Sequence, residues 1–284
     1  MTYDNPSYWR DLHQTLPGSL RAVGHPWLSE ALNDLKYQSE ASSLMDFLSN
    51  HRDIFSREGA PRILDIGAGT GFWTGVLQSW FTGQGVTSRV TAVDLSEEAL
   101  ALVKERFPDV ETVHADVSTV DPFRFRDAYD LVVSFYCLHH VPRISGFLNG
   151  LRFAARSVAP GGILLLMDPV LTQAYSPFYS TVFSSHEGNG MPRPLTIIDD
   201  AVNHEGLDRI FLSPAVSFLL NGPIESSSKL GSALTSRLWT WLQCAYASQR
   251  ATKTLAGPLA WTDGFLKRHA LAFSSSIVVY RKIR

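Results

Sequence analysis

The stretch ILDIGAGTGFWTGVL, residues 63–77, joins an apolar run to three alternating glycines and then to a second apolar run. Residues 62–66 are apolar and β-branched enough to predict a buried strand, and residues 70–81 predict a helix. Glycines between a strand and a helix let the backbone turn sharply and approach a ligand closely. Because the first N–H groups of a helix are free to bind an anionic group, the stretch predicts a cofactor-binding turn.

The spacing of the glycines indicates which cofactor the turn binds. A dinucleotide-binding turn has the pattern G-x-G-x-x-G, whereas Gly67, Gly69 and Gly71 place the third glycine one residue early. Asp65 lies two residues before the turn, where a carboxylate would repel a pyrophosphate. A ligand with a positively charged end, such as the ammonium of an amino acid, suits this position better.

A second strand is predicted at residues 90–94. It ends in Asp94, which lies 27 positions after Gly67. An acid at this point of a Rossmann-like unit reaches both ribose hydroxyls of an adenosine. Ser96 then has the side chain and the place of a helix cap, and a helix is expected to run from there to Pro108. The turn and the acid together predict a nucleoside-containing cofactor.

Three more strand ends follow in order. A short third strand at 112–114 precedes Asp116, and a fourth strand is predicted at 129–136. A Pro-Gly-Gly turn at 160–162 leads into a fifth strand that ends at Asp168. Strands that alternate with helices in this way predict an α/β fold with a parallel sheet.

These signals, in this order, resemble the class I S-adenosylmethionine-dependent methyltransferases of the small-molecule type, over residues 62–169. The resemblance implies an α/β fold with a doubly wound, seven-stranded, mostly parallel sheet whose last strand is antiparallel. It implies S-adenosyl-L-methionine as the cofactor and no metal. The cofactor-binding residues that we expect are Tyr37, Asp65, Gly67, Ala68, Gly69, Gly71, Asp94, Leu95, Asp116, Val117, Ser134 and Phe135.

The regions outside residues 62–169 are expected to cover the site. Residues 1–60 are expected to form an N-terminal helical lid, with one helix that starts at Pro26 and another that carries the apolar stripe of residues 41–48. Residues 61–284 are expected to form the methyltransferase domain, and lid and domain one structural unit. The domain includes an acceptor loop at 170–194 and a helical insertion at 226–270 that separates the last two strands.

The acceptor loop leaves the carboxyl end of the fifth strand, which is where open α/β sheets bind ligands. Its aromatic side chains predict a ring-bearing or partly apolar small-molecule acceptor, and its arginine suits an anionic group. The substrate-binding residues that we expect are Tyr136, Tyr175, Tyr179, His186 and Arg193.

His139 and His140 are the candidate catalytic bases, because histidine titrates near neutrality and both follow the fourth strand. His139 is preferred, since the family tends to bury the position that His140 resembles. A purely structural role for both is the alternative. Cys137 is expected to be a buried packing residue, because no proline precedes it as in cysteine-dependent RNA methyltransferases.

Composition excludes other classes of function. The chain of 284 residues has a net charge of −2 and no basic run, so no nucleic-acid partner is expected. No apolar run approaches the ~20 residues of a membrane span, so no membrane partner is expected. The two cysteines have no metal or disulfide spacing and favour the cytoplasm. A homodimer through the insertion is a further possibility.

The sequence thus predicts transfer of a methyl group from S-adenosylmethionine to a small molecule, with an oxygen of a natural product, a sugar or another secondary metabolite as the expected acceptor. One alternative is a protein that binds S-adenosylmethionine without methylating, or for regulation. A nicotinamide oxidoreductase is a third reading, which the glycine spacing and Asp65 disfavour.

Overall fold

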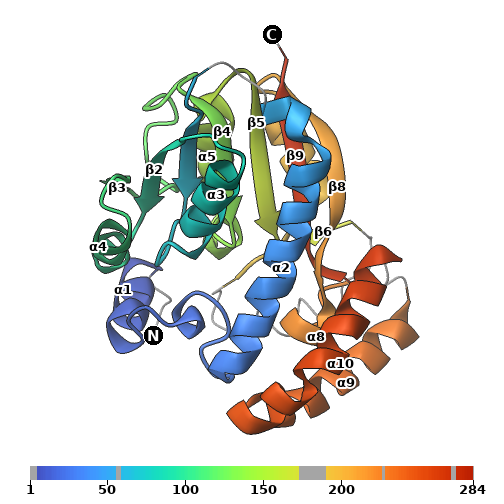
Figure 1. Cartoon of the computed structure of the whole chain (residues 1–284). Helices are drawn as coiled ribbons and strands as arrows, with labels where there is room; N and C mark the ends of the chain where they lie inside the picture. The colour runs from blue at the N-terminus through green and yellow to red at the C-terminus, as the bar shows by residue number, and fades with distance from the viewer. Residues whose placement is uncertain (1–4, 56–58, 173–189, 226–227, 270–272, 284) are drawn as a thin grey trace.

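The structure, a computed structural model, describes residues 5–55, 59–172, 190–225, 228–269 and 273–283 (Figure 1). A seven-stranded sheet with the order β3-β2-β1-β4-β5-β9-β8 forms its centre. Only β9 runs antiparallel to its neighbours, which confirms the predicted α/β sheet and its last strand. The strands are β1 Arg62–Ile66, β2 Arg89–Asp94, β3 Glu111–His114, β4 Tyr129–Phe135, β5 Val158–Asp168, β8 Leu207–Ser217 and β9 Phe273–Lys282.

Successive side chains along each strand point to opposite faces of the sheet, so the hydrophobic core has one part on each face. Ile63 and Leu131 lie on one face, and their chain neighbours Leu64 and Val132 lie on the other. Both faces are apolar because helices cover both of them, as is usual for parallel sheets. The helices of the first face are α2 Glu30–Asn50, α3 Phe72–Gly83 and α4 Glu97–Arg106, and those of the second are α5 Ile144–Ser157 and α7 Leu195–Asn203.

The N-terminal helices differ from the prediction in one respect. Besides α1, Asn5–Thr15, and the short η1, Leu20–Ala22, and η2, Arg52–Phe55, the region contains one long helix, α2, rather than two. Pro26 precedes α2, and Ser29 caps it by accepting a hydrogen bond from the backbone of Leu32. The two predicted stripes belong to this single helix because its first half packs on the C-terminal helices and its second half packs on the sheet.

A helical insertion separates the last two strands, as predicted. It consists of α8 Phe218–Asn221, α9 Lys229–Tyr246 and α10 Gln249–Arg268. The helix α10 begins nine residues before Pro258, after the cap Ser248. Pro258 lies on an exposed side of α10, where water can satisfy the carbonyl that loses its partner.

A separate two-stranded sheet brings together the two ends of the predicted acceptor loop. In it, β6 Val170–Leu171 pairs in parallel with β7 Arg193–Pro194. Residues 173–189, between these strands, lie outside the described residues. The strand β6 follows the carboxyl end of β5 directly, so the loop starts at the edge of the sheet that binds ligands in this class of fold.

Candidate functional site

A cavity opens at the carboxyl ends of β1, β2, β3 and β4, under α1 and α2. It encloses about 790 Å³ of empty space, its open mouth included. The cavity is lined by Asn5, Trp9, His13, Val23, Tyr37, Gly67, Ala68, Gly69, Thr70, Phe72, Trp73, Asp94, Leu95, Ala115, Asp116, Val117, Phe135, Tyr136, Cys137, His140 and Val141.

The glycine turn leaves no room for side chains. Gly67 and Gly69 have φ angles of 73° and 53°, in the left-handed region that favours glycine. A Cβ atom on Gly67 would lie 2.4 Å from the Cβ of Cys137, and one on Gly69 would lie 2.9 Å from a methyl group of Val23. The turn therefore presents bare backbone to the cavity, as the sequence predicted.

Asp94 holds this turn in place. Its carboxylate accepts hydrogen bonds from the backbone N–H of Gly69, at 2.8 Å, and of Ser96, at 2.9 Å. The side chain also lines the cavity. Because a carboxylate has about four acceptor positions, Asp94 can still accept hydrogen bonds from a ligand.

Asp65 lies beside the cavity but does not line it. It is buried, and its carboxylate accepts a 2.6 Å hydrogen bond from the hydroxyl of Thr74 in α3. Burial raises the pKa of Asp65 to about 6, the hydrogen bond from Thr74 opposes this shift, and the nearby charge of Asp94 adds to it. Two other expected cofactor residues, Gly71 and Ser134, also lie outside the lining. Gly71 instead directly precedes α3 and approaches Phe107, which follows α4.

His13 is the most unusual side chain of the cavity. It comes from α1, is 3% exposed, and neither of its ring nitrogens has a hydrogen-bond partner among the described residues. Burial lowers the pKa of His13, whereas the charges of Asp94 and Glu98 raise it. The hydroxyl of Thr70, in the glycine turn, is also buried without a partner. Unpaired buried polar atoms are costly, so their concentration in one cavity indicates a polar ligand.

The two candidate bases occupy different environments. His139 lies outside the cavity lining, and its Nδ1 is 2.7 Å from the Oδ1 of Asp168. Burial, with a smaller contribution from the charge of Lys36, lowers the pKa of His139 to about 3. His140 lines the cavity, and its ring meets that of Trp9 edge-on at 4.8 Å. The expectation that the fold buries His140 rather than His139 was wrong, because His139 is buried and His140 is only partly buried.

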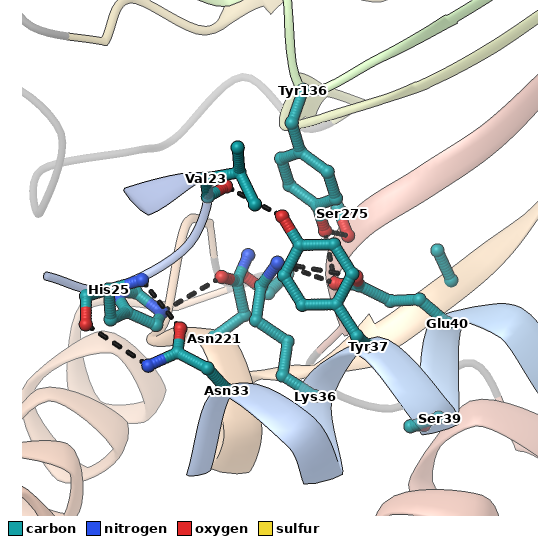
Figure 2. Close-up of polar contacts among 12 residues, drawn as sticks. Val23, His25, Asn33, Lys36, Tyr37, Ser39, Glu40, Tyr136, Asn221 and Ser275 are labelled. Carbon is teal, nitrogen blue, oxygen red and sulfur yellow. Dashed lines mark hydrogen bonds and ion pairs between the residues drawn. The ribbon is translucent and has the colours of Figure 1, made fainter. Parts of the chain in front are cut away.

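Tyr136 links the cavity to a buried polar cluster, which Figure 2 shows. Its hydroxyl donates a 2.5 Å hydrogen bond to Glu40 of α2 and contacts the hydroxyl of Ser275. Glu40 forms a buried ion pair with Lys36, and the Lys36 ammonium lies over the rings of Tyr37 and Tyr136. The backbone of Tyr136 has a φ angle of 54°, which is strained for a residue other than glycine. These contacts fix the aromatic wall of the cavity to α2.

Of the other expected substrate residues, the structure describes Arg193, which does not line the cavity. Arg193 donates hydrogen bonds to the backbone carbonyls of Val141 and Pro142, so its contact with an anionic acceptor group is not supported. Tyr175, Tyr179 and His186 lie outside the described residues.

Sequence reasoning missed several lining residues. His13 had a signal, because it follows Trp9 by four residues and so shares its face of a helix. Val23 had no such signal in the sequence, because its place in the lining depends on how the segment before α2 packs over Gly69. The other lining residues for which the sequence predicted no role are Asn5, Thr70, Phe72, Trp73, Ala115 and Val141. Cys137 lines the cavity, and burial raises the pKa of its thiol well above the usual value, so the thiolate is disfavoured.

Comparison with known proteins identifies the domain that carries this cavity. Residues 63–162 match a family model described as a methyltransferase domain. This matched part of the chain is a methyltransferase domain, and the sheet around it has the class I fold. Curated demethylmenaquinone methyltransferases of Staphylococcus aureus are 31% identical over 140 residues, which are 46% of this chain and 54% of theirs. The matched region thus spans about half the length of these relatives.

Solved structures share the fold of this chain at low sequence identity. A protein of Galdieria sulphuraria, assigned as a sarcosine dimethylglycine methyltransferase, aligns with a TM-score of 0.55 and 15% identity over 84% of each chain. Phosphoethanolamine N-methyltransferase 2 of Haemonchus contortus, solved with S-adenosylhomocysteine, aligns with a TM-score of 0.53 and 18% identity over 97% of this chain and 60% of that one. These likenesses support the fold.

Proposed function

We propose that the protein transfers a methyl group from S-adenosylmethionine to an oxygen atom of a small-molecule acceptor. One observation carries this proposal: the glycine turn, Asp94 and His140 line a single cavity at the carboxyl edge of a methyltransferase domain. The turn and the acid suit the cofactor, and the histidine suits a proton on the acceptor. The cavity therefore contains residues suited to binding the methyl donor and a residue suited to removing a proton from the acceptor.

The residues of the cavity fit the cofactor. Asp94 offers acceptor positions to ribose hydroxyls, and the unpaired nitrogens of His13 and the hydroxyl of Thr70 require polar partners. The backbone at Gly67 and Gly69 allows a ligand to come closer than any side chain would. Aromatic side chains close the remaining walls, namely Trp9, Tyr37, Phe72, Trp73 and Phe135.

S-adenosylmethionine, when bound, supplies an activated methyl group on a sulfonium. The protein then has to align the acceptor and exclude water. An oxygen acceptor must also lose a proton, and His140 is the titratable side chain of the lining that suits this role. The walls from α1 and α2, which include Trp9 and Tyr37, are placed to exclude water from the cavity.

The acceptor is a small molecule with apolar or ring character under this proposal. Aromatic and aliphatic side chains line most of the cavity near Tyr136 and His140. The name of the curated relatives, demethylmenaquinone methyltransferase, points in the same direction. The predicted homodimer stays a prediction.

The experiment combines a binding assay with a transfer assay. Calorimetry should show S-adenosylhomocysteine binding, and NAD should not bind. Asp94→Ala should weaken this binding by about 10- to 150-fold, because charge-assisted hydrogen bonds contribute about 1.5–3 kcal/mol. Asp208→Ala, at an exposed position of β8, is the control.

The transfer assay uses labelled S-adenosylmethionine with a metabolite extract and should label a small-molecule fraction. Failure to bind S-adenosylhomocysteine rejects the cofactor assignment. Binding without labelling of any fraction favours the non-methylating alternative.

A further inference from the structure

The helix α9 presents an apolar stripe to solvent. Leu230, Leu234, Leu238 and Trp241 follow one another at intervals of four, four and three residues, which places them on one side of a helix. Their exposed fractions are 70%, 59%, 43% and 78%. Single exposed apolar residues are ordinary, but four large ones in one stripe mark an interaction surface.

The opposite side of α9 is anchored in the protein. Trp239 and Tyr246 are buried in a cluster shared with α2, α8 and α10. The Tyr246 hydroxyl donates a 2.7 Å hydrogen bond to the carbonyl of Leu219, and the Tyr246 carbonyl accepts one of 2.9 Å from the backbone of Ser29. These contacts fix the rotation of α9, so its apolar stripe cannot turn inward without breaking them.

The helices α9 and α10 are strongly basic. Residues 229–268 contain six lysines and arginines and one acid, a net charge of +5, so the rest of the chain, whose total is −2, carries −7. The single acid, Asp263, is 1% exposed and lies 3.3 Å from Lys267. Five of the cations are exposed: Lys229, Arg237, Arg250, Lys253 and Arg268. The surface of these two helices thus combines apolar side chains with positive charge and no exposed carboxylate.

We propose that the outer side of α9 docks on the surface of an anionic lipid bilayer. Leucine and tryptophan side chains of a basic amphipathic helix insert at the boundary between headgroups and acyl chains, and lysines and arginines attract anionic headgroups. Arg237 lies three residues from Leu234 and four from Trp241 on the exposed side of α9, where its long side chain can reach lipid phosphates while its stem covers apolar surface.

A second copy of the chain fits this surface less well. A twofold dimer through α9 would pair the surface with itself and bring its exposed cations, including Arg237, close to their own copies. No exposed carboxylate of residues 229–268 would offset this repulsion. An anionic bilayer has the complementary charge.

A bilayer docked on α9 would lie on the side of the molecule at which the cavity opens. Figure 1 shows α8, α9 and α10 beyond the carboxyl ends of the parallel strands, the edge at which the cavity opens.

Among the described residues, none of the helices has the length and apolar character to cross a bilayer. Surface docking needs no crossing, so the expectation of no membrane partner, which came from the lack of a spanning run, does not cover it.

The test is co-sedimentation of the purified protein with vesicles, which does not depend on the proposed methyl transfer. Vesicles of phosphatidylcholine alone are compared with vesicles that also contain phosphatidylglycerol. We expect binding to the mixed vesicles that weakens as salt is added. Leu234→Ser and Trp241→Ser should each lower the partition coefficient about tenfold or more. Arg237→Glu should lower it for the mixed vesicles.

Phe123→Ser is the matched control, because Phe123 is a half-exposed apolar residue between β3 and β4. It should leave vesicle binding unchanged, and circular dichroism should show that every variant is folded. The proposal is overturned if the wild-type protein does not bind the mixed vesicles, or if Leu234→Ser and Trp241→Ser bind as well as Phe123→Ser. It is also overturned if light scattering shows a dimer that the α9 variants dissociate.

Discussion

The Nδ1 atom of His139 lies 2.7 Å from the Oδ1 atom of Asp168, where η3, Leu138–His140, meets the end of β5. Burial lowers the pKa of His139 to about 3 and raises the pKa of Asp168 well above its usual value. The next residue, His140, borders the cavity. The two adjacent histidines thus occupy separate environments, one buried against Asp168 and one at the cavity.

This difference predicts distinct effects for the two alanine variants. His140→Ala should lower turnover by about 100- to 10,000-fold, the usual contribution of a general base, with little change in S-adenosylhomocysteine affinity. His139→Ala should leave the Asp168 carboxyl buried without its partner and destabilise the fold by about 1–3 kcal/mol. Steady-state kinetics with the acceptor and urea unfolding separate the two effects. Normal turnover of His140→Ala would leave catalysis to proximity alone.

His13 should contribute to cofactor binding. His13→Ala should weaken binding of S-adenosylhomocysteine by about 2- to 12-fold, the equivalent of one neutral hydrogen bond. Gln14→Ala is the control, because Gln14 holds α1 to α4 through a 2.9 Å hydrogen bond to Glu98 and does not line the cavity. If calorimetry gives equal losses for both variants, the position of α1 matters and the imidazole itself does not.

Asp65 should make stability depend on pH. Its folded-state pKa of about 6 exceeds the usual 3.8, so its contribution to stability is complete below about pH 4 and is lost as the pH rises to about 6. The loss amounts to about 3 kcal/mol, because each unit of pKa corresponds to about 1.4 kcal/mol. Asp65→Asn should lack this loss, so its stability relative to wild type should rise between pH 4 and pH 7. Parallel urea-unfolding curves across this range would contradict the prediction, and Asp208→Asn is the control.

The glycine turn should tolerate no methyl group at Gly67. Gly67 and Gly18 have nearly equal φ angles, 73° and 70°, but only Gly67 has atoms within 4 Å of an added Cβ. Gly18→Ala should therefore cost about 1–2 kcal/mol of backbone strain, and Gly67→Ala a further 1–3 kcal/mol of overpacking against Cys137, as order-of-magnitude values. Thermal unfolding of both variants measures the difference. Equal losses would mean that Cys137 can move away.

Local patterns were sufficient to predict the sheet. Apolar runs define strands that contain Asp65 as the penultimate residue or end in Asp94 and Asp168, because burial on both faces of a parallel sheet demands nearly continuous apolar sequence. The glycine spacing fixed the turn in the same way, since positive φ angles and close approach are properties of the backbone at those positions. The helix boundary near Pro26 was missed because tertiary packing, and not the proline, set where α2 begins.

The sequence by itself determined the succession of strands along the chain, the glycine turn and the acids at or near the strand ends, because these depend on residues close together in the chain. Only the tertiary structure decided which side chains share the cavity. His13 and Val23 reach it because α1 and the segment before α2 fold back over β1 and β2. The different environments of His139 and His140 also depend on a distant partner, Asp168, which lies 29 residues from His139 in the chain. Such contacts leave no local periodicity, so the chain has to fold before they exist.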